Sequence, residues 1–281
     1  MKYFIKKLPS YLFLTIILIM TVFPLVYTIL ASFKTNQEII TGNATLFPKT
    51  FTLENYKAAW SDVNFNVPIL LKNSIWYSIC TVILQLVTTS LAGYVFARGH
   101  FTGQKVVFAI ITSLMFVNLG GATTVPTLKI INSLGLGGSL WGLILMKAFG
   151  INVAGIFMVR SYIQTLPKEL DEAASIDGCG FLRVFVKIIA PLLQPVLITI
   201  GILAFNASWN ETIMPTIFTL SRPDQRTLSA GLYALKNMGD SATQWNLMLA
   251  GSVIAMVPVL VTYAIANKYF VEGLSSGAVK G

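Results

Sequence analysis

Four carboxylates lie close together near the middle of the chain: Glu169, Asp171, Glu172 and Asp177. Acidic side chains at this spacing could transfer protons, hold a cation or contact a basic partner. The one histidine of the chain, His100, stands apart with no cysteine or histidine beside it. The acids are therefore interpreted as contact groups and helix-end charges, and no metal site or catalytic constellation is expected.

The two cysteines, Cys80 and Cys179, do not indicate a disulfide framework. Cys80 lies in an apolar run, and Cys179 lies in the polar segment that holds the carboxylates. Two cysteines in such different surroundings are not expected to pair.

The composition indicates a membrane protein. Of 281 residues, 55% are hydrophobic and 11% charged, with a mean hydropathy of +0.72. Soluble domains carry about 25% charged residues. The net charge of +9 does not indicate nucleic-acid binding, because the basic residues are scattered between apolar runs and form no basic face.

Six mostly apolar stretches reach the roughly 20 residues that a membrane-spanning helix needs. They are residues 11–33, 73–97, 106–125, 140–159, 191–215 and 247–267. The first follows a lysine-rich start, as in a signal peptide, but its apolar run exceeds the usual length of about 7–15 residues. It is therefore predicted to be an uncleaved span.

The loops between the spans predict the orientation. With the N-terminus inside, the inner segments 1–10, 98–105, 160–190 and 268–281 hold 11 basic residues in about 63 positions. The outer segments hold eight basic residues in about 84 positions. This modest excess favours a cytoplasmic position for both termini and for the acidic segment between spans four and five.

The acidic segment TLPKELDEAASIDG reads as a short helix with both ends marked. Pro167 suits a first helical position, and the acids that follow favour the positive end of a helix dipole. Gly178 could close the helix in the left-handed conformation. Helical spacing puts Leu170, Ala173, Ala174 and Asp177 on one shallow face.

The next segment, FLRVFVKIIAPLLQP, has helical apolar spacing, and Pro191 and Pro195 allow a bend where it re-enters the bilayer. On physical grounds the segment is either an interfacial helix without a partner or a docking helix for a cytoplasmic protein. The alanine face flanked by acids favours docking.

The acidic segment and the residues that follow it resemble a known family. The triplet Glu172-Ala173-Ala174, then Gly178, Ile188 and Pro191 at their spacing, resemble the EAA signature of the permeases of binding-protein-dependent ABC importers. LPKELDEAASIDG is similar to the maltose-type carbohydrate branch, and FNASWNE (205–211) and KYFVEGLSSGAVKG (268–281) agree. The likeness covers roughly residues 70–281. Ala190 departs from it, because the family more often has Leu there.

The resemblance implies an all-α integral membrane protein with six transmembrane helices, the type I ABC importer permease fold, and a cytoplasmic coupling helix between spans four and five. Glu172, Ala173, Ala174, Asp177 and Gly178 would couple it to an ATPase. The expected organisation is 1–69 for the first span and outer loop, 70–267 for the permease core with the EAA loop 160–190, and 268–281 for a cytoplasmic tail.

It also implies partners: a second, homologous permease forming a heterodimer, two ATP-binding subunits, an extracytoplasmic solute-binding protein, a sugar and membrane lipid. The chain has no G-x-x-x-x-G-K-[ST] stretch, so ATP and Mg²⁺ would bind the partner ATPase, and this chain would bind no cofactor. The expected location is the bacterial cytoplasmic membrane, crossed several times.

Polar residues within the spans are candidates for a substrate path. Lys147 stands in the apolar stretch LILMKAFGIN, where a charge is costly. It either pairs with Glu211 or a backbone carbonyl, or it lines the path. Further candidates, each of which could instead be architectural, are Asn118, Asn152, Trp209, Asn210 and Glu211.

Three other functions compete with the carbohydrate importer. A stand-alone secondary transporter would show an inverted repeat, which the halves lack, and would leave the EAA helix unexplained. A membrane enzyme using Glu211 or Lys147 lacks supporting groups. An ABC importer for a non-sugar solute such as glycerol phosphate remains open within the permease interpretation.

Overall fold

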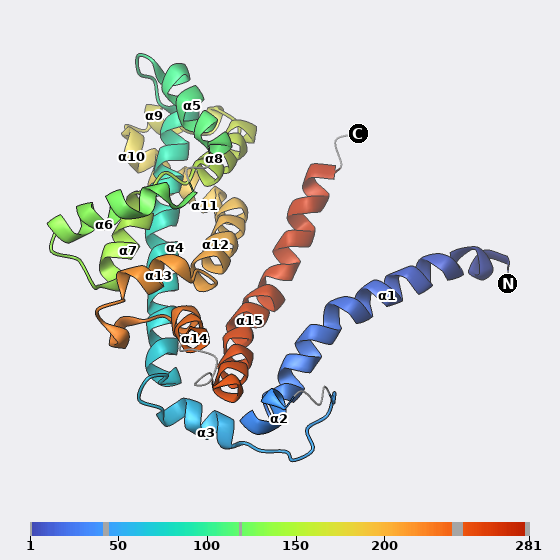
Figure 1. Cartoon of the computed structure of the whole chain (residues 1–281). Coiled ribbons are helices and arrows are strands. Elements are labelled where there is room, and N and C mark those ends of the chain that lie inside the picture. The colour runs from blue at the N-terminus through green and yellow to red at the C-terminus, as the bar shows by residue number, and fades with distance from the viewer. Residues whose placement is uncertain (1, 42–44, 118–119, 238–243, 279–281) are drawn as a thin grey trace. The chain divides into compact units, whose positions relative to one another are not determined.

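The computed structural model is helical and holds no strand in the residues that it describes, 2–41, 45–117, 120–237 and 244–278. This confirms the predicted all-α class. Figure 1 labels the α-helices, whose bounds are α1 Lys2–Ala31, α2 Asn36–Ile40, α3 Glu54–Ser61, α4 Val67–Arg98, α5 Gln104–Ser113, α6 Thr124–Ser133, α7 Leu140–Phe149, α8 Val153–Thr165, α9 Glu169–Ile176, α10 Phe181–Val184, α11 Ala190–Leu192, α12 Gln194–Trp209, α13 Ile213–Phe218, α14 Leu228–Lys236 and α15 Trp245–Ala278.

By length and composition, the described residues contain up to six spans, if each bent helix pair is counted as one span. Among the described residues, three helices are each long and apolar enough to cross a membrane: α1, α4 and α15. The other three spans are pairs joined by a sharp bend: α5 with α6, α7 with α8, and α10–α11 with α12. The structure therefore adds bends that hydropathy alone does not reveal.

The bend between α7 and α8 is 42°. Gly150 leaves the helix with an extended backbone, φ −65° and ψ 143°. Asn152 then caps α8, because its Oδ1 accepts a hydrogen bond from the Gly155 N–H at 3.0 Å. A polar side chain thus supplies the acceptor that the broken helix cannot provide.

The bend before α12 is 78° and separates Leu192 from Gln194. Pro195 has no N–H to donate to the carbonyl of Pro191, and its ring disfavours a helical backbone before it. The bend predicted from these two prolines is confirmed.

The chain divides into two compact units. Unit 1 comprises Met1–Leu71 and Gly231–Val257, and unit 2 comprises Lys72–Ala230 and Pro258–Gly281. In unit 1, Asn55 Nδ2 donates to the carbonyls of Ser32 and Lys34, each at 2.7 Å. Its Oδ1 accepts from Asn246 Nδ2 at 2.9 Å, which ties α3 to the start of α15.

Unit 2 holds the elements of interest, and α4 runs beside several of them (Figure 1). One core cluster joins Tyr94 of α4 to Val159 and Ile163 of α8, and to Ala174 of α9. Gly93 permits the close approach of α4 and α8: a Cβ placed there would lie 2.5 Å from Val159 Cγ1. The backbone of α4 at Gly93 therefore packs directly against the side chain of Val159 in α8.

We expect Gly93→Ala to destabilise the protein by about 1–3 kcal/mol, because the added methyl group overpacks the contact with Val159. The measurement is thermal unfolding of the purified protein in detergent, followed by circular dichroism.

Gly201→Ala is the matched control. It also adds a methyl group inside a helix, but its Cβ would lie 3.5 Å from Leu86 Cδ1, an ordinary contact. Because alanine is the better helix former by about 1 kcal/mol, this variant should unfold at the same temperature or higher. Equal melting temperatures for the two variants would contradict the close packing of α4 on α8.

Candidate functional site

α9 is the short helix that carries the acidic segment. It begins at Glu169, so Pro167 lies two residues before it and not at its first position as predicted. Leu166 is extended, as the residue before a proline prefers, with φ −79° and ψ 139°. Lys168 has a helical backbone, φ −71° and ψ −24°, and its carbonyl accepts from the N–H groups of Asp171 and Glu172.

The other end of α9 closes as the glycine predicts. Gly178 has φ +78°, the left-handed conformation that side chains disfavour. The Cys179 N–H then donates to the Ala174 carbonyl at 2.9 Å, which completes a Schellman-type end. Both ends of this eight-residue helix are therefore fixed by local hydrogen bonds.

Besides its chain connections to α8 and α10, α9 is held to the rest of unit 2 by an ion pair with α4 and by one buried methyl group. Arg98, the last residue of α4, places its Nε 2.8 Å from Asp171 Oδ2 and donates from Nη2 to the Leu166 carbonyl at 2.9 Å. Ala174 is 4% exposed and packs in the cluster around Tyr94.

The exposed face of α9 differs from the predicted one. Ala174 points inward, whereas Ala173 is exposed together with Glu172 and Asp177. Ile176 lies on this exposed side and is 87% accessible. The two alanines thus lie on different sides of α9. Ala174 packs the helix against its own chain, and the small side chain of Ala173 leaves the helix backbone accessible to a partner.

A second polar group of residues surrounds Lys147 near the end of α7. Its Nζ forms an ion pair with Glu211, the residue after Asn210 at the end of α12. Tyr77 of α4 donates its hydroxyl to the same carboxylate oxygen at 2.8 Å. The predicted pairing of Lys147 with Glu211 is therefore present, and Tyr77 joins a third span to it.

Lys147 also lines a cavity of about 700 Å³. The bend between α7 and α8 forms one wall, where Asn152 and the start of α8 face the cavity, and α12 contributes Ser208. Gln85 of α4 adds an amide. Because hydroxyl-bearing ligands need donors and acceptors in a concave site, this cavity has suitable chemistry for a polar solute. The two predicted alternatives for Lys147 are thus not exclusive.

The remaining predicted path residues are placed differently. Trp209 is 2% exposed and stacks on Phe205 with ring centroids 5.6 Å apart, so its ring is covered by its own chain. Asn210 is exposed and donates from Nδ2 to the Asn206 carbonyl at 3.0 Å. Asn118 lies outside the described residues.

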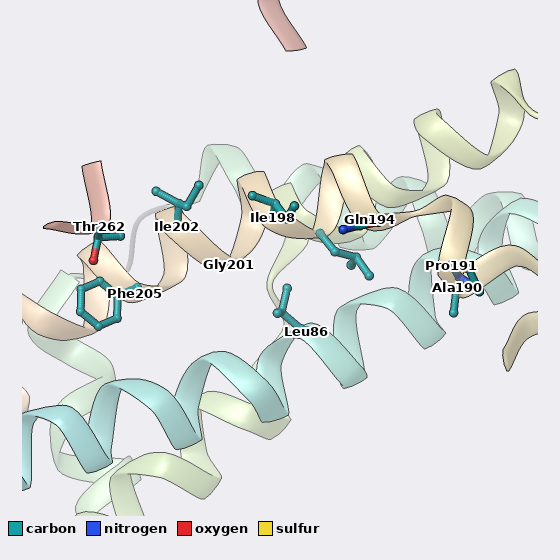
Figure 2. A pocket seen from close by; sticks show the side chains of 10 residues that line it. Leu86, Ala190, Pro191, Gln194, Ile198, Gly201, Ile202, Phe205 and Thr262 are labelled. Carbon is teal, nitrogen blue, oxygen red and sulfur yellow. The ribbon is translucent and has the colours of Figure 1, made fainter. Parts of the chain in front are cut away.

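A second hollow, of about 630 Å³, lies along α12 and is mainly apolar. Figure 2 shows Leu86, Ile198 and Phe205 around it, with the side-chain amide of Gln194 near one end. Such a lining suits hydrocarbon and gives a sugar few partners. The cavity beside Lys147 is therefore the better candidate for a solute.

Sequence reasoning missed Tyr77, Gln85 and the contact of Arg98 with Asp171. Gln85 is a polar residue inside the predicted span 73–97, so the criterion applied to the other path residues would have selected it. Tyr77 lies in the same span, where aromatic residues are common, and no local signal marks it. Arg98 has the position of a charge at the end of a span, which is common to membrane proteins. Only the fold brings it to Asp171, 73 residues away.

Comparison with known proteins agrees with this architecture. The family model described as binding-protein-dependent transport system inner membrane component matches residues 3–275. A chain from the crystal structure of a bacterial ABC transporter involved in the import of the acidic polysaccharide alginate superposes with a TM-score of 0.80 at 22% identity, covering 95% of this chain and 96% of that one. That likeness supports the fold.

Two relatives are similar over almost the whole chain. The probable ABC transporter permease protein YurM of Bacillus subtilis (strain 168) is 32% identical over 280 residues, covering 100% of this chain and 91% of that protein. The arabinooligosaccharides transport system permease protein AraQ of Halalkalibacterium halodurans is 33% identical over 262 residues, covering 92% and 91%. The chain therefore belongs to the family of binding-protein-dependent transport system inner membrane components, the permease subunits of ABC transporters.

Proposed function

We propose that the chain is the permease of an ATP-driven carbohydrate importer, and that α9 is its coupling helix. The observation that carries the proposal is the exposed face of α9, where Glu172 and Ile176 stand out from a helix fixed at both ends. The similarity to an arabino-oligosaccharide permease supports a saccharide as the solute.

The face of α9 suits a cleft on a partner ATPase. Glu172 would meet a basic side chain there, Ile176 would fill an apolar pocket, and Ala173 would let the two backbones approach closely. Asp177 and Gly178 would border this contact, whereas Ala174 supports it from beneath. ATP and Mg²⁺ would bind the ATPase and not this chain, whose sequence has no phosphate-binding glycine loop.

The solute would pass the cavity beside Lys147. Asn152 and Ser208 supply neutral hydrogen-bonding groups, and Lys147 adds a cation that Glu211 compensates. This set suits the hydroxyl groups of a saccharide. A second permease of the same family would form a heterodimer with this chain, two ATPase subunits would dock beneath, and a solute-binding protein would deliver the sugar on the outer side. The excess of basic residues in the inner loops supports cytoplasmic termini.

The direct test reconstitutes the chain with the neighbouring permease, ATPase and binding protein in proteoliposomes. Maltotriose, arabinotriose and trigalacturonate are offered in turn, and both uptake and ATP hydrolysis are measured. At least one should accelerate hydrolysis and accumulate inside. Solute movement by the purified chain alone along an ion gradient would overturn the importer assignment.

Glu172→Arg should prevent normal docking of the ATPase. Reversing an interfacial charge that meets an opposite charge costs about 2 kcal/mol or more, which is a loss of about 30-fold or more in affinity. Because the side chain is exposed, the fold of the isolated chain should be unaffected. The measurement is co-purification of the ATPase together with sugar-stimulated hydrolysis.

Glu54→Lys is the control, because Glu54 is also an exposed carboxylate, 72% accessible, on α3 and far from α9 in sequence. It should assemble and couple like the wild type. A Glu172→Arg complex that assembles and couples equally well would disprove the docking role.

The roles of Lys147 can be separated with Glu211. Lys147→Met leaves the carboxylate of Glu211 without its cation, and Glu211→Gln leaves the ammonium group uncompensated, so each single variant should lose about 1–3 kcal/mol of stability. The double variant removes both charges, so it should recover the stability that each single variant loses and should assemble normally. If Lys147 contacts the solute, uptake by the double variant stays several-fold below wild type. If the double variant takes up solute as fast as the wild type, the Lys147–Glu211 pair has only a structural role.

A further inference from the structure

We infer that the Arg98–Asp171 ion pair is the joint through which the coupling helix moves α4, and that both residues position α9 without touching the ATPase. The inference rests on the proposed function, since it takes α9 as the docked element. It assigns to Asp171 a role different from that of its neighbour Glu172, which is exposed.

The geometry of the pair is that of a fixed joint. Arg98 uses two different nitrogens, Nε toward Asp171 at 2.8 Å and Nη2 toward the Leu166 carbonyl at 2.9 Å. One guanidinium thus holds α9 and the C-cap residue of α8 together. The side chains of Arg98 and Asp171 are only 9% and 20% exposed, so solvent screens their attraction less than that of a surface pair.

α9 has little else to hold it. It has eight residues, too few for stability in isolation, and its one buried side chain is the methyl group of Ala174. Asp171 Oδ1 is buried without a hydrogen-bond partner among the described residues, so the carboxylate depends on Arg98. Apart from its covalent links to α8 and α10, α9 is connected to α4 through this ion pair and through the packing of Ala174 in the cluster around Tyr94. A force applied to the exposed face of α9 therefore reaches α4 mainly through these two contacts.

α4 can carry that force to the cavity. Arg98 is its last residue, and the helix is continuous back to Tyr77, 21 residues or about 32 Å away at 1.5 Å per residue. Tyr77 donates to Glu211, which pairs with Lys147 at the cavity wall. A rigid displacement of α4 at one end would thus alter the polar contacts beside the cavity at the other.

The test measures saccharide uptake and ATP hydrolysis in the same reconstituted complex, with the oligosaccharide of the panel above that the wild type takes up fastest. Asp171→Asn keeps an acceptor for Arg98 but removes the charge. Arg98→Lys keeps the charge but replaces the two fixed guanidinium donors, one toward Asp171 and one toward Leu166, with a single flexible ammonium group. Both complexes should assemble and hydrolyse ATP, while the saccharide imported per ATP falls by about fivefold or more.

Asp224→Asn is the matched control. It removes the carboxylate of the other Arg–Asp pair among the described residues, Arg222–Asp224 at 3.1 Å, whose side chains are 55% and 58% exposed and which joins no two helices. Its ratio of uptake to hydrolysis should equal that of the wild type. If Asp171→Asn and Arg98→Lys also keep the wild-type ratio, or lose uptake and hydrolysis in equal proportion, the joint is disproved.

A chemical cross-link tests whether the joint stays closed during transport. Arg98→Cys and Asp171→Cys are combined with Cys80→Ser and Cys179→Ser, which removes both native thiols. A short bifunctional maleimide should restore the coupling ratio that the unlinked double-cysteine complex lacks. Cross-linking that leaves the ratio low, or stops hydrolysis, means that α9 and α4 must separate, and it overturns the inference.

The outcomes distinguish this inference from the proposed function. If none of the three saccharides stimulates the wild-type complex, the importer proposal fails and the joint fails with it. If the wild type imports a saccharide and the joint variants retain its coupling ratio, the joint alone is wrong.

Discussion

The constraint on which the rest of this structure depends is that backbone polar groups inside a membrane must be satisfied within the protein. It explains why the apolar spans are helical, and it makes each helix break informative. At the bend between α7 and α8 the backbone opens, and the Asn152 side chain replaces a lost carbonyl by accepting from Gly155. The same opening forms the wall of the cavity beside Lys147. The site and the departure from helical geometry thus have one origin.

Charges in this chain are used sparingly, and the two partly buried ion pairs of unit 2 both involve α4. Arg98 pairs with Asp171 at its last residue, and Tyr77 joins the Lys147–Glu211 pair nearer its start. Such pairs contribute little net stability, because desolvation offsets the attraction. Their effect is to determine which elements pack beside α4. Apolar packing alone would distinguish less well between alternative neighbours.

Much of the fold was predictable, because long apolar runs and proline positions are local signals. The bend at Pro191 and Pro195 and the left-handed Gly178 follow directly from residue chemistry. The inward turn of Ala174 does not, since Ala173 and Ala174 have equal propensities and only the neighbouring helices decide which one is covered. Of the two roles that the sequence leaves open for Trp209, substrate path or architecture, packing selects the second, because its ring is buried against its own chain. Periodicity identifies a face, but tertiary packing determines its neighbour.

The division of labour within α9 follows from its length. A helix of eight residues makes about two turns, so almost every side chain faces either the chain's own bundle or the outside. Asp171 and Ala174, three residues apart, take the inner side, while Glu172 and Ile176, four apart, take the outer one. Adjacent acids therefore serve opposite surfaces. Such a coupling helix transmits motion only if its contacts with its own bundle stay intact while its contacts with the ATPase change. The Arg98–Asp171 pair, which is shielded from solvent, meets that condition better than an exposed ion pair would.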